Sequence, residues 1–388
     1  MSETAIETST GGRGAAAALT RAGDIAIRSL VPLVLALLAG GVLLAVLGRN
    51  PFSFYGSVWT YGVAEGNWQQ SAVTMVPFLL IATGLAVIFR ANIWNLGYWG
   101  QFALGAALVA GLGPWLTTHL PLALAFVLLF LVAGAAGAAW TLIPAVLKAR
   151  YGTNEIITTL MMSFIGVGIA DILIQGPFQD PTVRTPQTQS IDFDKLMPAI
   201  PGTTIDASII VALVFVGAVH FLLTRTAFGL RLHILGLNPR AARHVGANVP
   251  RLVITSFLIS GGLIGAAAAA WVLSPLQGYL RADQIPNFGD LIIPFVFLAR
   301  LNALAVVPFV AFYAVLFTGG TLATTSVNLP TDFLLVLVAL ILLFMTLIEF
   351  VGRRRDLGQS YLPDGLREAF RKPLVRRRSA QEAGVTEA

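Results

Sequence analysis

The chain of 388 residues is 56% hydrophobic and only 11% charged, and its mean hydropathy is +0.79. Soluble globular proteins carry roughly 25% charged residues, so this composition excludes an ordinary soluble domain and indicates a polytopic membrane protein. The formal net charge is +6, but the cations fall between apolar runs, as membrane insertion requires, and nucleic acid is not an expected partner. Because the chain has no cysteine, a disulfide framework, a thiolate metal site and a cysteine nucleophile are excluded.

The two ends of the chain are polar. Residues 1–28 are rich in Ala, Gly, Ser and Thr, which predicts a disordered cytoplasmic tail. The apolar run from Ser29 to Leu47 is longer than a usual signal-peptide core, and no Ala-x-Ala cleavage site follows it, so an uncleaved first span is favoured. We expect a transmembrane domain over 29–351 and a cytoplasmic tail over 352–388.

The apolar runs predict an all-α fold, a transmembrane helical bundle of about ten spans at about 20 residues per span. The expected segments are 29–47, 72–89, 93–111, 121–147, 156–174, 207–223, 253–273, 288–299, 303–321 and 332–350. The segment 288–299 is short or broken because Asp290, Pro294 and Arg300 interrupt it, which is typical of a half-helix or re-entrant segment along a pathway. If it does not cross, eight or nine spans remain.

Lys and Arg in the short loops predict the orientation. With ten spans, the cations that fall on one side are Arg90, Lys148, Arg150, Arg225, Arg231, Arg240, Arg243, Arg251, Arg300, Arg353, Arg354 and Arg355. Both termini are then cytoplasmic. The opposite loops, 48–71 and 175–206, carry mixed charge. The long, proline-containing loop 175–206 is then expected on the side opposite to the termini.

A polar stretch at 224–252 contains five arginines and no acidic residue. Within it, Asn238 is a favoured N-cap, Pro239 suits the first helical position, and Gly246 is placed to end a helix. A short helix outside the membrane is therefore expected, with Arg240 and Arg243 on one face. The alternative for each arginine is ordinary positive-inside bias with contacts to lipid phosphate.

Four segments in order resemble the integral permease subunits of bacterial ABC importers, in the simple sugar and nucleoside branch related to branched-chain amino acid permeases. They are Asn92-Ile-Trp-Asn-Leu-Gly97 with Gly100-Gln101, Gly152-Thr-Asn-Glu-Ile-Ile157, Phe228-Gly-Leu-Arg231 with Gly236-Leu-Asn-Pro239 and Ala241-Ala242, and Ser260-Gly-Gly262 with Gly265. Together they cover roughly residues 70 to 350. Tyr98, Trp99 and Ala247 depart from the family pattern, which leaves the substrate open.

The resemblance implies that 29–351 is a permease domain in a bacterial inner membrane. Such a subunit pairs with a second permease, docks separate ATPase subunits and receives substrate from an extracytoplasmic binding protein. The loop 175–206 would then be periplasmic, and we expect it to help dock the binding protein. The chain itself has no Gly-x-x-x-x-Gly-Lys-Ser/Thr loop, so ATP hydrolysis by this subunit is not expected, and no cofactor or metal is implied. The coupling residues implied by the resemblance are Gly236, Asn238, Pro239, Arg240, Ala241, Ala242, Arg243 and His244.

A pathway for a polyhydroxylated solute needs hydrogen-bonding groups and flat aromatic faces. Trp94, Asn95, Trp99 and Gln101 offer both within one expected span, although an interfacial aromatic belt also accounts for the tryptophans. Asn154 and Glu155 are placed to line the exit, although an N-cap followed by an acidic first turn explains them without a ligand.

Two other classes remain open at this point. An ion-coupled secondary transporter needs intramembrane carboxylates, for which Asp171, Asp290, Asp332 and Glu349 are the candidates, although all lie near expected span ends. A membrane-embedded enzyme needs a catalytic constellation, and none is recognisable around the 4 histidines. Small residues at Gly261, Gly265, Ala266 and Ala269 predict close helix packing within the subunit.

Overall fold

The computed structural model describes residues 29–330 and 332–356 and, within that part of the chain, consists of helices without a named strand. Two compact units are present: residues 39–338 form the larger one, and the smaller includes the described residues 29–38 and 339–356. The expected tail at 1–28 and most of the expected tail at 352–388 lie outside the described residues. The all-α fold is confirmed.

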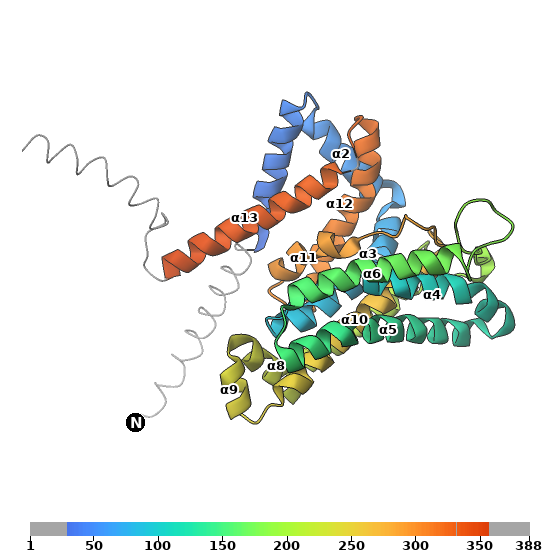
Figure 1. Ribbon diagram of the computed structural model, residues 1–388. Coiled ribbons are helices and arrows are strands. Elements are labelled where there is room, and N and C mark those ends of the chain that lie inside the picture. Colours follow the sequence, from blue (N-terminus) through green and yellow to red (C-terminus); the bar gives the residue numbers. More distant parts are fainter. Residues whose placement is uncertain (1–28, 331, 357–388) are drawn as a thin grey trace, which may run out of the picture. The chain divides into compact units, whose positions relative to one another are not determined.

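The elements follow one another along the chain as shown in Figure 1. They are the helix Ser29–Val46, α2 (Pro51–Gly62), α3 (Trp68–Arg90), α4 (Tyr98–His119), α5 (Leu122–Val146), α6 (Glu155–Gln175), α7 (Ser208–Arg225), α8 (Ala227–Leu237), α9 (Pro239–His244), α10 (Val249–Val272), α11 (Phe288–Leu298), α12 (Val306–Ser326) and α13 (Phe333–Asp356). A π-helical turn, Leu147–Tyr151, extends α5.

Every one of the expected segments contains a helix, and 8 helices of the described chain are long and apolar enough to cross a membrane. The two expected spans outside that set are α4, with 22 residues, and α11, with only 11 residues. At 1.5 Å per residue α11 is about 16 Å long, roughly half the thickness of a bilayer core of about 30 Å. The expectation of a half-helix at 288–299 agrees with this length.

One expected helix start was wrong, and two helices were not predicted. The segment expected to be helical from residue 93 begins its helix only at Tyr98, because Asn92 has a φ of 56° and residues 93–97 are not helical. Helices α2 and α8 were not predicted, since neither is long enough to cross a membrane. The Asn50 side chain caps α2 by accepting from the Phe52 and Ser53 amides, and Thr226 caps α8.

Helices α3 and α10 lie at the centre of the larger unit. In their most apolar windows 89% and 72% of residues are buried, against 22–28% for α5, α6 and α7. Close approach explains the small residues of α10: a Cβ added at Gly261 would lie 2.5 Å from the Gly137 carbonyl oxygen, and one at Gly265 would lie 2.0 Å from that of Ala133. The predicted packing within the subunit is confirmed, with α5 as the partner of α10.

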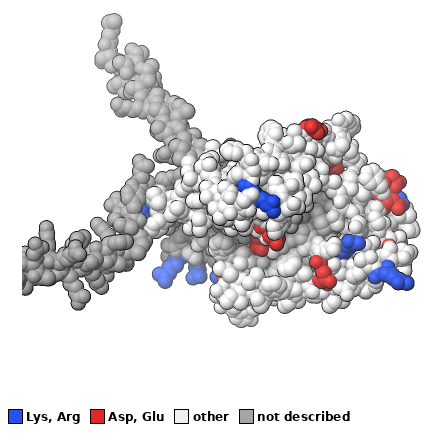
Figure 2. All heavy atoms as spheres, turned by 90° about the horizontal axis from the view of Figure 1, so that it is seen from above, with Lys and Arg blue, Asp and Glu red and all other residues white. Residues whose placement is uncertain are grey.

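The outer surface of the described chain is mainly uncharged. On the face drawn in Figure 2, Lys, Arg, Asp and Glu form small separate patches on a surface of other residues. Large apolar side chains such as Val127, Leu131, Phe164 and Ile172 are exposed on α5 and α6. Such a surface suits lipid, or a second membrane subunit, rather than water.

The segment between α6 and α7 is held by backbone hydrogen bonds to the segment that follows α10. The Thr188 amide donates to the Leu280 carbonyl and the Met197 amide to the Leu273 carbonyl, each at 2.9 Å. The buried Asp206 carboxylate accepts from the Ser274 hydroxyl at 3.0 Å and from the Ser208 amide at 3.1 Å. The predicted periplasmic loop is therefore attached to the bundle through the 273–282 segment.

Candidate functional site

The non-helical segment between α3 and α4 is fixed by a pair of buried side-chain amides. The Asn95 Nδ2 donates to the Gln101 Oε1 at 3.1 Å, and the Gln101 Nε2 donates to the Asn95 Oδ1 at 2.9 Å. Asn95 also donates to the Ser260 hydroxyl of α10 and accepts from the Gly97 amide, both at 3.1 Å. Asn95 and Gln101 are 0% and 1% exposed, and in this conformation they hold the break in the chain.

Helix α6 supports the start of α4. The Thr159 hydroxyl accepts from the Leu96 amide at 3.0 Å, and the Ser163 hydroxyl accepts from the Gly100 amide at 3.1 Å. Ser163 lies eight residues into α6, about 12 Å from the beginning of that helix at 1.5 Å per residue. Helix α4 therefore begins inside the bundle rather than at its end.

The first turn of α11 meets the first turn of α4. The Tyr98 hydroxyl donates to the Asp290 carboxylate, and the Trp99 Nε1 donates to the Ile285 carbonyl at 3.0 Å. The Asn287 side chain donates to the other Asp290 oxygen at 2.6 Å. Two helices that each begin within the bundle thus bring their N-termini together around one carboxylate.

Aromatic rings surround this meeting point. The Phe288 ring at the start of α11 contacts the rings of Phe78 of α3, Phe102 of α4 and Trp271 of α10, at centroid distances of 4.9, 5.5 and 6.0 Å. Phe78 lies twelve residues before Arg90, about 18 Å from that end of α3. The starts of α4 and α11 therefore lie at a similar depth in the bundle. We call Tyr98, Asn287, Phe288 and Asp290 the half-helix site.

Asp290 is exposed on the surface of the single chain even though it lies at this depth. Charged side chains at membrane depth face a water-filled cavity or another protein group rather than lipid, because hydrocarbon does not solvate them. The N-termini of two helices also stabilise a negative charge through their unpaired amides and dipoles. Nearby, the buried Oδ1 of Asn287 has no hydrogen-bond partner in the described structure, and neither has the Tyr313 hydroxyl.

The other residues predicted to line the pathway have local explanations. Trp94 is half-buried and packs with the rings of Phe89 and Phe297 at 5.1 and 5.7 Å. The Asn154 side chain caps α6 by accepting from the Ile156 amide, and Glu155 forms an ion pair of 2.7 Å with Lys148. Of the predicted set, Trp99 adjoins the half-helix site through its hydrogen bond to the Ile285 carbonyl. The central residues of the half-helix site, Tyr98 and Asp290, were not in the set of residues predicted to line the pathway.

The short helix predicted in the Arg-rich stretch is present as α9. The Asn238 side chain accepts from the Arg240 and Ala241 amides at 2.8 and 3.3 Å, Pro239 occupies the first turn, and Gly246 has a φ of 74° just after the helix. Of its residues only Ala242 is fully buried, while Arg240, Arg243 and His244 are exposed. The predicted capping is confirmed.

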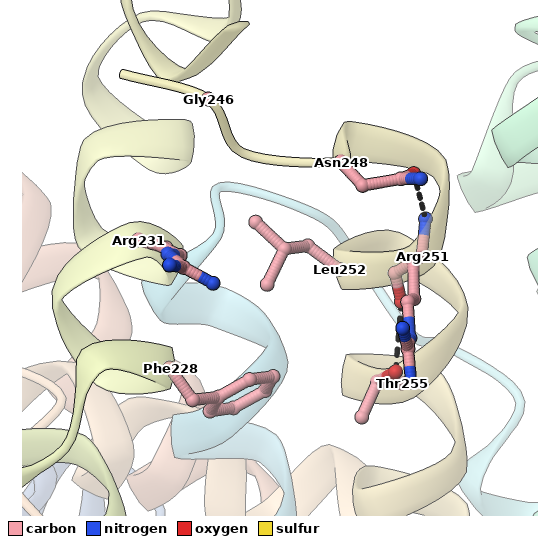
Figure 3. A pocket seen from close by; sticks show the side chains of 7 residues that line it. All are labelled: Phe228, Arg231, Gly246, Asn248, Arg251, Leu252 and Thr255. Carbon is pink, nitrogen blue, oxygen red and sulfur yellow. Dashed lines mark hydrogen bonds between the residues drawn. The ribbon is translucent and has the colours of Figure 1, made fainter.

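Beside α9, an open cavity of about 480 Å³ separates α8 from the start of α10. Figure 3 shows Phe228 and Arg231 extending from α8 toward this cavity, with Leu252 facing them from α10. Arg251 also lines the cavity, and its amide donates to the Asn248 side chain at 3.1 Å. We call α9 together with this cavity the coupling surface. The coupling surface combines four arginines with apolar side chains: Arg240 and Arg243 of α9, and Arg231 and Arg251 of the cavity.

The described residues contain no cluster of three or more His, Asp or Glu that could hold a metal ion. In the loop before α7, the side-chain and backbone donors of Thr182 lower the pKa of Asp180, and the hydrogen bond to Asp192 raises the pKa of Lys195. Both shifts belong to local loop contacts and imply no reaction.

Comparison with known proteins gives a consistent result. The family model described as "Branched-chain amino acid transport system / permease component" matches residues 67–346. The glucose ABC transporter permease protein TsgB13 of Haloferax volcanii is 31% identical over 82% of this chain and 87% of its own length. The guanosine ABC transporter permease protein NupP of Bacillus subtilis is 28% identical over 81% of this chain and 91% of its own length. The nucleoside ABC transporter permease protein NupB of Lactococcus lactis is 23% identical over 83% of this chain and 90% of its own length.

No solved structure matches the chain significantly. The family match covers most of the chain and includes the half-helix site and the coupling surface. The chain therefore belongs to the family of branched-chain amino acid transport system permease components, and it is a multi-pass membrane permease subunit of an ABC importer.

Proposed function

We propose that this subunit translocates a small, neutral, polar solute, a nucleoside or a simple sugar, and that the half-helix site contacts the solute on its way. The names of the relatives support this class, since they specify glucose, guanosine and nucleosides. The chemistry supports it too. A carboxylate and an amide oxygen accept hydrogen bonds from hydroxyl groups, and aromatic rings cover the flat faces of a sugar or a base.

The observation that carries the proposal is the exposed Asp290 carboxylate at the meeting point of α4 and α11. In membrane transporters, solute sites form where broken helices end near the middle of the bilayer. A neutral solute needs no countercharge, and Tyr98 and Asn287 already donate to the carboxylate. Exchange of these donors for solute hydroxyl groups would let the site open and close without leaving a charge unsolvated.

Replacing Asp290 with Asn tests this role in the complete importer. The substitution keeps the size of the side chain but removes charge-assisted hydrogen bonds, each worth about 1.5–3 kcal/mol, so we expect uptake to fall about tenfold or more. Asp283→Asn is the matched control, because Asp283 is an exposed acid in the same connection, and its φ of 60° suits Asn. Equal uptake by the wild type and Asp290→Asn, with normal amounts in the membrane, would refute the proposal.

The partners follow from the same reading. We propose that separate ATPase subunits dock on α9 and on the adjoining cavity, where cationic and apolar side chains are exposed together. We propose further that a second permease subunit covers the exposed face of Asp290, and that a substrate-binding protein contacts the 176–207 segment. The cations near α9 support a cytoplasmic location for this end of the bundle and for both termini.

A further inference from the structure

A second cavity, of about 530 Å³, lies at the end of the bundle that carries α9, on the other side of α8 from the coupling surface. Four parts of the chain form it: the C-terminal ends of α3 and α7, helix α8, and the connection between α11 and α12. Its lining consists of Phe89, Arg90, Asn92, Thr224, His233, Gly236, Leu237, Arg300, Leu301 and Asn302. We call it the interfacial cavity.

The ionisable side chains of the interfacial cavity are all basic. Arg90 and Arg300 contribute guanidinium groups and His233 an imidazole, whereas no Asp or Glu is among the lining residues. The ion pairs found in the described part of the chain involve none of these three side chains. The Nε of Arg90 is buried without a hydrogen-bond partner there. Cationic donors that gather without a carboxylate suit an anionic ligand, because charge-assisted hydrogen bonds are stronger than those to a neutral acceptor.

The backbone around Arg300 is held in an uncommon conformation. Arg300 and Leu301 both have positive φ, 52° and 59°, a region that residues other than glycine rarely adopt, least of all twice in succession. Asn302 fixes the connection by accepting from the Leu304 and Ala305 amides at 3.0 and 3.3 Å. Strained backbone of this kind is retained where surrounding structure and function require it, and here it places Arg300 at the cavity.

We propose that the interfacial cavity binds a phosphate group, supplied by an anionic phospholipid of the leaflet on the α9 side. Arginine suits phosphate because its planar guanidinium presents paired donors. Two features favour a lipid as the source. The cavity lies where α3 and α7 end, which is the level of the headgroups. Its rim includes the apolar side chains Phe89, Leu237 and Leu301, and Leu237 is 75% exposed. These side chains would contact the glycerol and upper acyl chains.

The site would join the ends of α3 and α11 through one ligand. Arg90 terminates α3, and Arg300 follows the last turn of α11, the helix whose other end carries Asp290. A phosphate bridging the two guanidinium groups would offset their mutual repulsion and fix the position of α11. The inference does not depend on the identity of the solute or on the partners proposed above.

The test uses the purified full-length chain in mild detergent and counts retained lipids by native mass spectrometry after equilibration with equal amounts of phosphatidylglycerol and phosphatidylcholine. The wild type is expected to retain phosphatidylglycerol in preference by about tenfold, because paired arginines favour the net anionic lipid. The variant His233→Gln plus Arg300→Gln, which alters two exposed side chains, is expected to lose the preference. Arg300→Lys keeps the positive charge, and we expect this variant to retain part of the preference for phosphatidylglycerol.

The matched control is Arg150→Gln plus Arg225→Gln, which removes two exposed arginines outside the cavity. It should retain phosphatidylglycerol as the wild type does. A second arm titrates inorganic phosphate against chloride at equal ionic strength. Phosphate binding that His233→Gln plus Arg300→Gln abolishes, without any lipid preference, would keep the phosphate site and overturn the lipid as its source. Equal lipid retention and no phosphate binding in all variants would overturn the proposal and leave the cavity as protein-docking surface.

Discussion

The side chains of Asn95 and Gln101 donate hydrogen bonds to each other at 3.1 and 2.9 Å, deep inside the bundle. They close a ring across the non-helical residues that separate α3 from α4. Ser260 of α10 completes the network by accepting from Asn95 at 3.1 Å. A buried network in which the polar groups are paired specifies one arrangement of the chain, and here that arrangement allows α4 to begin inside the bundle.

The first prediction concerns this network. Asn95→Ala leaves the buried Gln101 amide without its partner and should lower the free energy of unfolding by about 1–3 kcal/mol. Thermal unfolding of the purified subunit in detergent measures the effect as a lower Tm. Asn92→Ala is the control, because Asn92 is exposed and has no side-chain hydrogen bond of this kind, although its positive φ makes a small loss expected there too. An Asn95→Ala protein as stable as the Asn92→Ala protein would contradict the role of the network.

The second prediction concerns the close contact of α5 and α10. Gly261→Ala places a Cβ 2.5 Å from the Gly137 carbonyl oxygen, so the helices must separate and the subunit should unfold at a lower temperature. Gly262→Ala is the neighbouring control, since its nearest atom would lie at 3.6 Å, an ordinary contact. Equal melting temperatures for the two variants would show that this contact is not close in the folded protein.

The third prediction concerns the N-cap of α9. Asn238→Ala removes the acceptor for the Arg240 and Ala241 amides, which costs a helix about 1 kcal/mol. We expect solute-stimulated ATP hydrolysis by the assembled importer to fall severalfold, while the melting temperature of the subunit changes little. Asn238→Asp preserves the cap and should preserve most of the stimulation. If both variants behave like the wild type, the geometry of α9 does not matter for coupling.

The fourth prediction concerns the proposed docking of a binding protein. Phe193 is 77% exposed on a short turn between Asp192 and Asp194, in the segment before α7. An exposed ring of this kind is a suitable anchor for a partner, so Phe193→Ser should lower uptake at limiting binding protein and have little effect when that protein is in excess. ATP hydrolysis without binding protein serves as the control and should be unchanged. Normal uptake at every concentration would exclude this turn from the contact.

The sequence predicted the helices by length and hydrophobicity, and the caps at Asn154 and Asn238 by local chemistry, because both depend on neighbouring residues. It did not predict the loss of helix at residues 93–97. Those residues are apolar enough for a span, and the bonds that hold them open come from Thr159 and Ser260, which are distant in the chain. The Tyr98 to Asp290 contact was missed for the same reason. The one local indication of a site there was that Asp290 interrupts the apolar segment 288–299.

The most direct measurement is co-purification of the tagged subunit from native membranes in mild detergent, beside the variant Arg240→Glu plus Arg243→Glu. The account predicts that an ATPase subunit accompanies the wild type and is lost from the variant, because both arginines are exposed on α9. Arg150→Glu plus Arg225→Glu, with the same change of charge outside α9, should retain it. If the ATPase subunit remained bound to the α9 variant and its activity still responded to the solute, the assignment of α9 as the coupling element would be contradicted.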